Sequence, residues 1–280
     1  MPLNFADAAL LIALGVGVGT YGSIVGAGGG FLLVPLLLLL QTSDPPRLIT
    51  TISLAVVSIN GISSTLAYAR MRRIDFESGI LLSLSSIPGA IAGAWVTRFV
   101  PRGLFDLGFG LLLVGVAVWL LIPTRPAARL GSPPAGWIQR RFVDPSGTSY
   151  FYAYARWTAL LIGFAGGLIG TIAGIGGGIL VVPAIVAWLH FPVHVATATS
   201  ALVFMVSSLT GTTTHLIAGD FEFDISQVLF LSIGVVVGAQ VGAHVSGRLS
   251  HGFIIRLLAA GIALIGVRLI FAGISIPTPQ

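Results

Sequence analysis

The sequence predicts an all-α polytopic membrane protein, and three observations support this fold class. Hydrophobic residues make up 55% of the 280 residues and charged residues 8%, whereas soluble domains are about 25% charged. The mean hydropathy of +1.01 leaves too few polar side chains to cover a surface that faces water. The 37 glycines suit helices in a bilayer, where small residues let two backbones approach closely.

Eight apolar segments are expected to lie in the membrane, because a helix needs about 20 residues to cross about 30 Å of hydrocarbon. They cover 8–40, 48–69, 78–97, 103–122, 158–189, 195–219, 225–247 and 252–274. Five prolines and five arginines lie between the fourth and fifth segments, so this stretch is expected outside the membrane. The chain therefore divides into a first repeat, 1–122, an extramembrane linker, 123–157, and a second repeat, 158–280.

The linker contains a turn signal, Asp-Pro-Ser-Gly at 144–147. The stretch Arg-Phe-Val precedes it at 141–143, and the aromatic stretch Tyr-Phe-Tyr follows it at 150–152. This pattern favours a small β-hairpin.

The two halves of the chain are copies of one unit. Gly26–Pro35 matches Gly174–Pro183 at an offset of 148 residues. In the next segment the offset is 147, and it pairs Ser53 with Ser200, Asn60 with Ser207 and Tyr68 with His215. Duplication of a transmembrane unit is typical of secondary transporters, in which the substrate site lies between the repeats.

Charge in one pair of equivalent loops favours inverted repeats. The loop after the second segment carries arginines in the first half and acidic residues in the second: Arg70, Arg72 and Arg73 against Asp220, Glu222 and Asp224. Positive residues favour the cytoplasm, so we expect the two loops on opposite sides. Inversion requires an odd number of crossings per repeat, which a re-entrant first segment would supply. A kinked first segment with parallel repeats is the alternative.

A Gly-x-Gly-Gly-Gly cluster interrupts the first segment of each half, five residues before a proline. Each glycine costs a helix about 1 kcal/mol relative to alanine, so we expect a helix break. The restarted helix would present free N–H groups and its positive dipole end, which suits an anion. The candidate substrate-binding glycines are Gly28, Gly29, Gly30, Gly176, Gly177 and Gly178. Close helix packing is the alternative interpretation.

Polar side chains on one face of the second segment complete the candidate binding site. Hydroxyls and a carboxamide can bind an oxyanion without a fixed charge in the membrane, and the candidates are Ser53, Asn60, Ser200 and Ser207. Serine can instead bond to a carbonyl of its own helix. Asn60 needs partners that its own helix does not supply.

Three further residues are candidates for proton coupling. His215 and His244 lie in apolar segments, and histidine titrates near physiological pH. Gln240 lies one helical turn before His244. The alternative for each histidine is a hydrogen-bonded or interfacial side chain. Asp106, Arg256 and Arg268 lie near segment ends and are expected to reach the interface.

Other classes of function find no support in the sequence. The chain has no Cys, which removes disulfides and thiolate metal sites. His190 and His194 have a helical metal spacing, but Pro192 lies between them and opposes the helix they would need. The cations are scattered arginines, which does not suit nucleic acid. We therefore expect no enzyme, no metal and no cofactor, and the lipid bilayer and a small anion as partners.

At these motifs the sequence resembles the sulfite exporter TauE/SafE family. The resemblance covers roughly 8–122 and 158–274 and rests on the doubled Gly-rich motif with its trailing proline, on Ile74-Asp75-Phe76, and on the paired Gly-Ala dipeptides at 89–94 and 238–243. It implies a multi-pass permease of the cell inner membrane that moves small anions outward without ATP, typically sulfite or organosulfonates such as sulfoacetate. The linker is longer and richer in arginine than the resemblance implies.

The sequence thus favours a permease that exports a small sulfur-containing oxyanion by alternating access. Three alternatives stay open: an uptake permease for thiosulfate or a small carboxylate, an anion channel, and a membrane scaffold. Nothing in the sequence fixes the oligomeric state.

Overall fold

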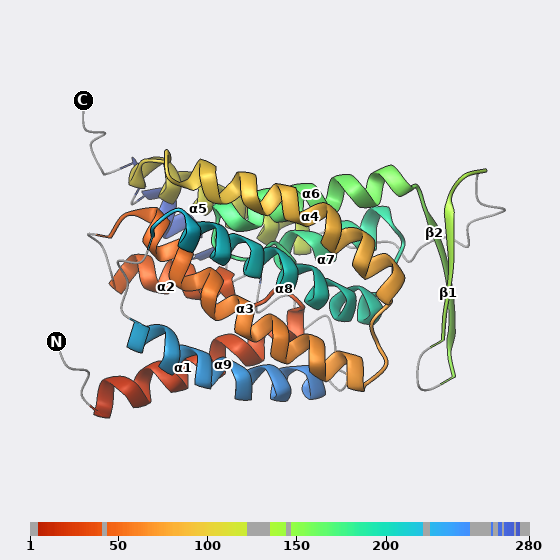
Figure 1. Cartoon of the computed structure of the whole chain (residues 1–280), viewed down its shortest axis with the longest axis horizontal. Coiled ribbons are helices and arrows are strands. Elements are labelled where there is room, and N and C mark those ends of the chain that lie inside the picture. The colour runs from red at the N-terminus through yellow and green to blue at the C-terminus, as the bar shows by residue number, and fades with distance from the viewer. Residues whose placement is uncertain are drawn as a thin grey trace.

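A computed structural model describes residues 5–40, 44–121, 135–143, 147–220, 225–246, 259, 263–264, 266–271 and 273–274. It contains helices and one hairpin (Figure 1). The elements are α1 (Phe5–Val25), α2 (Gly30–Leu40), α3 (Pro46–Arg70), α4 (Phe76–Thr97), α5 (Arg102–Leu121), β1 (Ile138–Val143), β2 (Ser149–Tyr154), α6 (Arg156–Ile172), α7 (Gly178–Trp188), α8 (Val193–Ile217) and α9 (Ile225–Val245).

Six of the described helices are long and apolar enough to cross a membrane: α1, α3, α4, α5, α8 and α9. The first segment of each half is not one span but two helices, α1 with α2 and α6 with α7. α2 and α7 have 11 residues each, about 16 Å at 1.5 Å per residue, which is too short to cross the bilayer. The eighth predicted segment, 252–274, lies largely outside the described residues.

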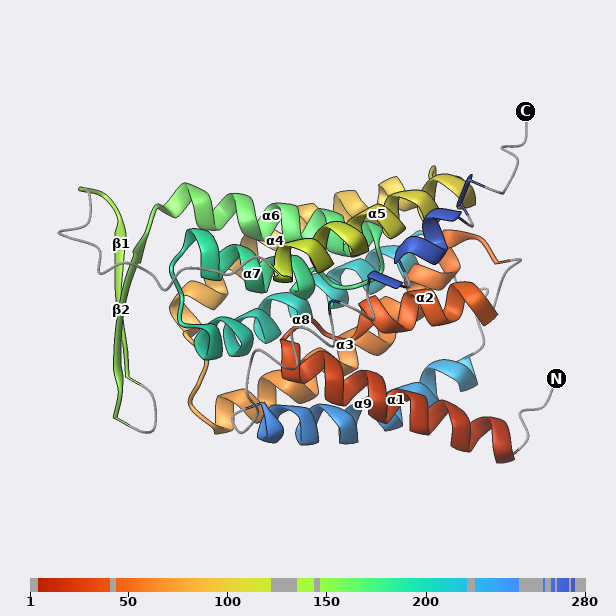
Figure 2. The same ribbon diagram turned by 180° about the vertical axis from the view of Figure 1, so that it is seen from behind.

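The helices of the two halves interleave. α1 packs along α9 and α4 packs along α6, while α3 and α8 pack together between these pairs (Figures 1 and 2). Gly15 approaches Leu231, and Gly242 approaches Thr20, so α1 and α9 run in the same direction. α3 and α8 run in opposite directions, as Ser58 meets Thr212 and Gly61 meets Met205.

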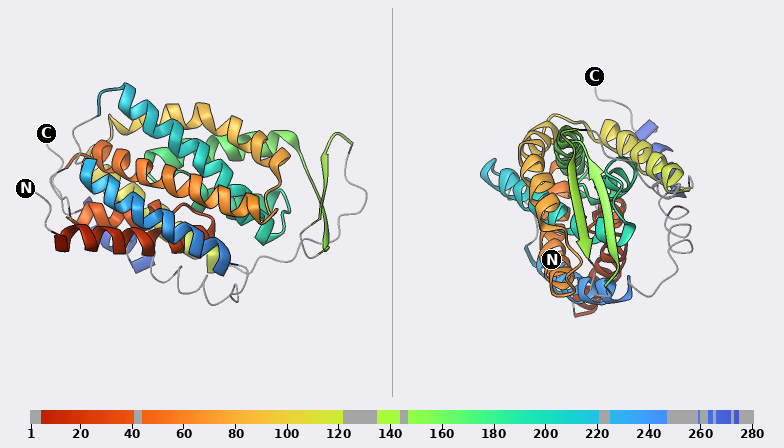
Figure 3. Two further views of the ribbon diagram at one scale, coloured as in Figure 1. Left: turned by 60° about the horizontal axis from the view of Figure 1, so that its bottom comes forward. Right: turned by 90° about the vertical axis from the view of Figure 1, so that its right-hand side faces the viewer.

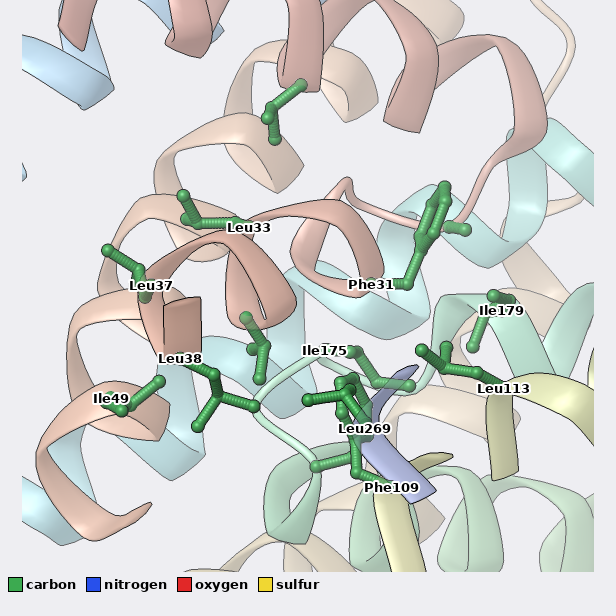
Figure 4. Close-up of a cluster of buried hydrophobic side chains, with 14 of the residues drawn as sticks. Phe31, Leu33, Leu37, Leu38, Ile49, Phe109, Leu113, Ile175, Ile179 and Leu269 are labelled. Atoms are coloured by element: carbon green, nitrogen blue, oxygen red, sulfur yellow. The ribbon is translucent and has the colours of Figure 1, made fainter. Parts of the chain in front are cut away.

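Two short helices fold back into the bundle. After α1 the chain turns, and α2 returns toward the end where α1 began; α7 likewise returns toward the hairpin after α6 (Figure 2). α2 is apolar on all sides, which is typical of a helix buried in protein. Its side chains pack with those of α3, α5, the second break and the C-terminal helical residues in one apolar cluster (Figure 4): Phe31, Leu33, Leu37, Leu38, Ile49, Phe109, Leu113, Ile175, Ile179 and Leu269.

The predicted hairpin is confirmed. β1 and β2 pair antiparallel, with Arg141 opposite Phe151 and Ile138 opposite Tyr154. The hairpin projects beyond the helix ends on one side of the bundle (Figure 3). We call this side the hairpin end, and the opposite side, where α1 begins and α8 ends, the far end.

Candidate functional site

The two helix breaks lie where the glycine clusters predict them. Gly26, Gly28 and Gly29 have φ angles of +75°, +77° and +77°, and their equivalents Gly174, Gly176 and Gly177 have +71°, +69° and +83°. Residues with a Cβ rarely adopt these angles. Glycine therefore permits the same sharp turn in both halves, and α2 and α7 restart at Gly30 and Gly178.

Two serines tie each break to the other half of the chain. Ser53 Oγ of α3 donates to the carbonyl of Gly174 at 2.6 Å. Ser200 Oγ of α8, its equivalent, donates to the carbonyl of Gly26 at 2.8 Å. The two bonds are reciprocal, and all four residues are buried.

The other two polar candidates hold the break of their own half. Asn60 Nδ2 donates to the carbonyl of Gly28 at 2.8 Å, and Ser207 Oγ donates to the carbonyl of Gly176 at 2.5 Å. The structure therefore places Ser53, Asn60, Ser200 and Ser207 at the breaks. In this conformation their donor hydrogens point at break carbonyls.

The backbone carbonyls at the breaks accept hydrogen bonds from side chains, but several backbone N–H groups there have no hydrogen-bond partner in the part of the chain that the structure describes. Among the described residues, no hydrogen bond is donated by the N–H groups of the three residues that begin each short helix: Gly29, Gly30 and Phe31, and Gly177, Gly178 and Ile179. The following residues already donate within the turn, with Leu32 N 3.0 Å from Gly29 O and Leu180 N 3.0 Å from Gly177 O. Each break thus offers three donors at a helix N-terminus, a local arrangement that favours negative charge.

The breaks also pack directly against each other. A Cβ added at Gly30 would lie 2.7 Å from Ile175 Cα, and one added at Gly178 would lie 2.8 Å from Ala27 Cα. Both glycine clusters are fully buried. The close packing considered as an alternative to a break therefore occurs together with the break.

Among the described residues, the three proton-coupling candidates make no hydrogen bond to the breaks. His215 is fully buried near the far end, with Nδ1 2.9 Å from Asp220 Oδ2. Gln240 of α9 donates to the backbone carbonyl of Ser63 at 2.9 Å and to its hydroxyl at 3.0 Å. His244 is exposed, and its Nδ1 is 2.8 Å from the Gln240 carbonyl. The structure pairs Gln240 with His244 and separates both from His215.

Sequence reasoning missed Ser23 of α1. Its hydroxyl lies 2.6 Å from the Ser64 hydroxyl and donates to Asn60 Oδ1 at 3.4 Å, so it anchors the side chain that holds Gly28. Its position three residues before the first cluster was a usable signal. Within the described residues no three His, Asp or Glu side chains are placed to share a metal ion.

Comparison with known proteins places the chain in a family. The family model "Sulfite exporter TauE/SafE" matches residues 11–269. The chain is 34% identical to the probable membrane transporter protein YunE of Bacillus subtilis, over 95% of this chain and 98% of that protein. It is 25% identical to a probable membrane transporter protein of Methanocaldococcus jannaschii, over 92% and 93%, and 27% identical to one of Xylella fastidiosa strain Temecula1, over 86% of each. No solved structure matches. A family model that covers nearly the whole chain, together with a relative this similar, means that the chain belongs to the sulfite exporter TauE/SafE family.

Proposed function

We propose that the protein is a secondary transporter that exports small sulfur-containing oxyanions, such as sulfite or sulfoacetate, across the cell inner membrane by alternating access. Membership of the sulfite exporter family and the names of the relatives, probable membrane transporter proteins, support the general class. The observation that carries the choice of an anion is the set of three N–H groups without an acceptor at each break.

In this proposal the breaks bind the anion through backbone donors. The serines and Asn60 occupy the break carbonyls, which would otherwise repel an oxyanion that approaches the N–H groups. The positive dipole ends of α2 and α7 add a favourable field. A site without an arginine releases its substrate more readily than a buried ion pair would, and a negative cell interior drives an anion outward by about 2.3 kcal/mol per charge per 100 mV.

We also propose that 1–122 and 158–280 are inverted repeats joined by an extramembrane linker. The opposite directions of α3 and α8 support this, as do the reciprocal bonds of Ser53 and Ser200. Rocking of one repeat against the other would then expose the breaks to each side in turn.

Cysteine accessibility tests the inversion. Arg70 and Ile217 are equivalent and exposed residues at the ends of α3 and α8, and the chain has no native Cys. In intact cells an impermeant thiol reagent should label only one of Arg70→Cys and Ile217→Cys. Labelling of both from the same side would contradict inversion.

Binding is tested with the purified protein and a panel of sulfite, sulfate, thiosulfate, sulfoacetate and lactate. A ligand at about 100 times its Kd stabilises a protein by about 2.7 kcal/mol, so a substrate should raise the melting temperature. Stabilisation by none of these anions would refute the proposed site. Counterflow of labelled substrate in proteoliposomes separates a transporter from a channel, since a channel shows none.

Glycine variants test the position of the site. Gly29→Ala and Gly177→Ala place a Cβ 2.6 Å from Val18 O and 2.3 Å from Gly166 O, at φ angles that disfavour alanine. Both should abolish stabilisation by the anion. Gly17→Ala is the matched control, because a Cβ at that position in α1 meets nothing within 4 Å. A membrane scaffold predicts that the variants change stability without changing the response to anions.

A further inference from the structure

The two halves differ in the polar residues that line the end of the first helix of each repeat. In the first half these residues form a closed set: the Ser23 hydroxyl contacts Ser64 and Asn60, and Tyr68 OH donates to the Ser23 carbonyl at 2.7 Å. Each of these side-chain hydroxyl or amide groups has a partner. These hydrogen bonds join α1 to α3, and they leave no side-chain polar group of the set without a partner.

The equivalent residues of the second half are Thr171, Ser207, Gly211 and His215. Gly211 lacks the hydroxyl of Ser64, and Ser207 donates to the Gly176 carbonyl. Thr171 Oγ1 and His215 Nε2 are left without a hydrogen-bond partner among the described residues, although both side chains are fully buried. Buried polar atoms of this kind are rare and costly.

This pair of unpartnered atoms is specific to the second half. Ser83 and Ser232, which are equivalent to each other, also lack hydrogen-bond partners within the described ranges. An unpartnered hydroxyl at that position is therefore common to both halves. Thr171 and His215 replace residues that are fully bonded in the first half. Thr65 Oγ1 of the first half also lacks a described partner, but only the second half has two such atoms in this one set of equivalent residues. We take this difference as the starting point for a local function of the second half.

Thr171 and His215 border the same place. A Cβ at Gly211 would lie 2.8 Å from Thr171 Cγ2 and 3.2 Å from its Oγ1, so Thr171 of α6 packs over Gly211 of α8. His215 is one helical turn beyond Gly211, on the same face of α8. Thr171 therefore packs against the face of α8 that carries His215.

The other edge of the imidazole belongs to an ionic cluster. Nδ1 is 2.9 Å from Asp220 Oδ2. Arg98 at the end of α4 and Arg47 at the start of α3 lie 3.6 Å and 3.7 Å from Asp220 Oδ1. α6 contributes Thr171, and α7 contains no ionisable side chain. Asp220 thus has positive groups on one side and the histidine on the other, and it can balance the charge of an imidazolium.

We propose that His215 Nε2, with Thr171 Oγ1, is the proton-binding site that couples anion transport to proton movement. A hydronium ion on one side gives its proton to the lone pair of Nε2, so that one O–H bond breaks as the N–H bond forms. The proton then leaves to a water molecule on the other side, so that the N–H bond breaks and an O–H bond forms. In the protonated state Nδ1–H donates to Asp220, and Nε2–H faces Thr171. This inference rests on the proposed anion transport.

The test is calorimetry of sulfoacetate binding to the purified protein in buffers of different ionisation enthalpy, between about pH 6 and pH 8, where histidine titrates. The dependence on buffer gives the number of protons exchanged per anion bound. Sulfoacetate keeps its charge in this range, whereas sulfite itself takes up a proton. We expect about one proton in this protein and none in His215→Gln, which still binds the anion.

His194→Gln is the matched control, because His194 is exposed near the start of the same helix, and it should leave the proton exchange unchanged. Anion binding without proton exchange, or the same exchange in His215→Gln, would overturn the proton site and leave the proposed function standing. If none of the oxyanions in the panel above binds, the proposed function fails and this inference with it.

A second variant guards against misfolding. The triple change Thr171→Ser, Gly211→Ser and His215→Tyr copies residues that already pack in the equivalent place of the first half. It should bind sulfoacetate without exchanging a proton. Exchange that persists in this variant would also overturn the proposal.

Discussion

The hairpin end and the far end of the bundle each contain a buried aspartate, but the partners hold it differently. Asp75, at the hairpin end, accepts from Arg140 at 2.7 Å and from the Tyr152 hydroxyl at 2.7 Å. Asp220, at the far end, lies 2.9 Å from His215 Nδ1, but its two arginines are at 3.6 Å and 3.7 Å. Charged hydrogen bonds normally measure about 2.7–2.9 Å. The group around Asp75, which we call the hairpin lock, is therefore tightly bonded, whereas the ion pairs of Asp220 with its two arginines are longer.

Electrostatics sharpen this contrast. Burial raises the pKa of the Asp75 carboxyl, but hydrogen bonds from Arg140, Ser78 and Tyr152 outweigh burial and hold the pKa below its ordinary value. Burial and the neighbouring Asp75 both raise the pKa of Tyr152. At neutral pH Asp75 is therefore a charged carboxylate that accepts a hydrogen bond, and Tyr152 is a neutral phenol that donates one to it.

The largest expected effect is loss of the hairpin lock in Asp75→Ala. The change removes the N-cap of α4 and leaves Arg140 and the buried Tyr152 hydroxyl without their acceptor. We expect the free energy of unfolding to fall by about 3 kcal/mol, and protease to cleave the hairpin faster than in the unchanged protein. Denaturation in detergent and limited proteolysis measure the two effects. Unchanged cleavage would mean that the hairpin is held by its apolar contacts alone.

A smaller loss is expected when the charge of Asp220 at the far end is removed. Asp220→Asn keeps the size of the side chain and removes the charge that faces Arg98, Arg47 and His215. Because these ion pairs are long and their arginines partly exposed, we expect about 1 kcal/mol. Denaturation beside Asp75→Ala compares the two ends directly. If Asp220→Asn lowers the free energy of unfolding as much as Asp75→Ala does, Asp220 is held as strongly as Asp75 and the distinction between the two ends is wrong.

Arg140→Lys tests how the lock depends on geometry. Arg140 reaches both Asp75 oxygens, through Nη2 at 2.7 Å and Nε at 3.2 Å, and lysine cannot form this fork. We expect a loss of about 1 kcal/mol. Glu77→Gln is the control, since the Glu77 carboxylate also meets Arg140 but is exposed, and exposed pairs contribute little. If the lysine variant is as stable as this control, the fork has no role.

The smallest effect is expected from mild acid at the hairpin end. A carboxyl whose folded pKa is lowered stabilises the protein above its unfolded pKa, about 3.9 for Asp, and loses that contribution as pH falls through the folded value. Between about pH 5 and pH 8 the rate of hairpin cleavage by a protease should therefore stay constant. A rise in cleavage within that range would show that another group controls the lock.

The local features of this fold could be predicted from the sequence. Apolar length located most helices, the glycine clusters located both breaks, and the turn signal at 144–147 located the hairpin. These features depend on neighbouring residues, since helix propensity and turn chemistry act over a few positions. The position of Gly30 and Gly178 at the start of a new helix followed from the same local reasoning.

The partners of the polar residues could not be predicted in this way. Ser53 bonds to Gly174, which is 121 residues away in the sequence, and Asp75 bonds to Arg140, which is 65 residues away. Helical spacing put Ser53 on a polar face but gave no distance between the two halves. The sequence therefore assigned its hydroxyl to a substrate, and the structure shows that it donates to a backbone carbonyl.

The reciprocal bonds from Ser53 to Gly174 and from Ser200 to Gly26 have an energetic consequence for the alternating-access cycle proposed above. If opening toward one side breaks one bond, opening toward the other breaks its near-identical counterpart, so the two states differ little in intrinsic free energy. A ligand or gradient then needs to supply only a small bias to shift the population. The net direction of transport would be set by the solute gradients and the membrane potential, and the protein itself would act as an almost unbiased exchanger.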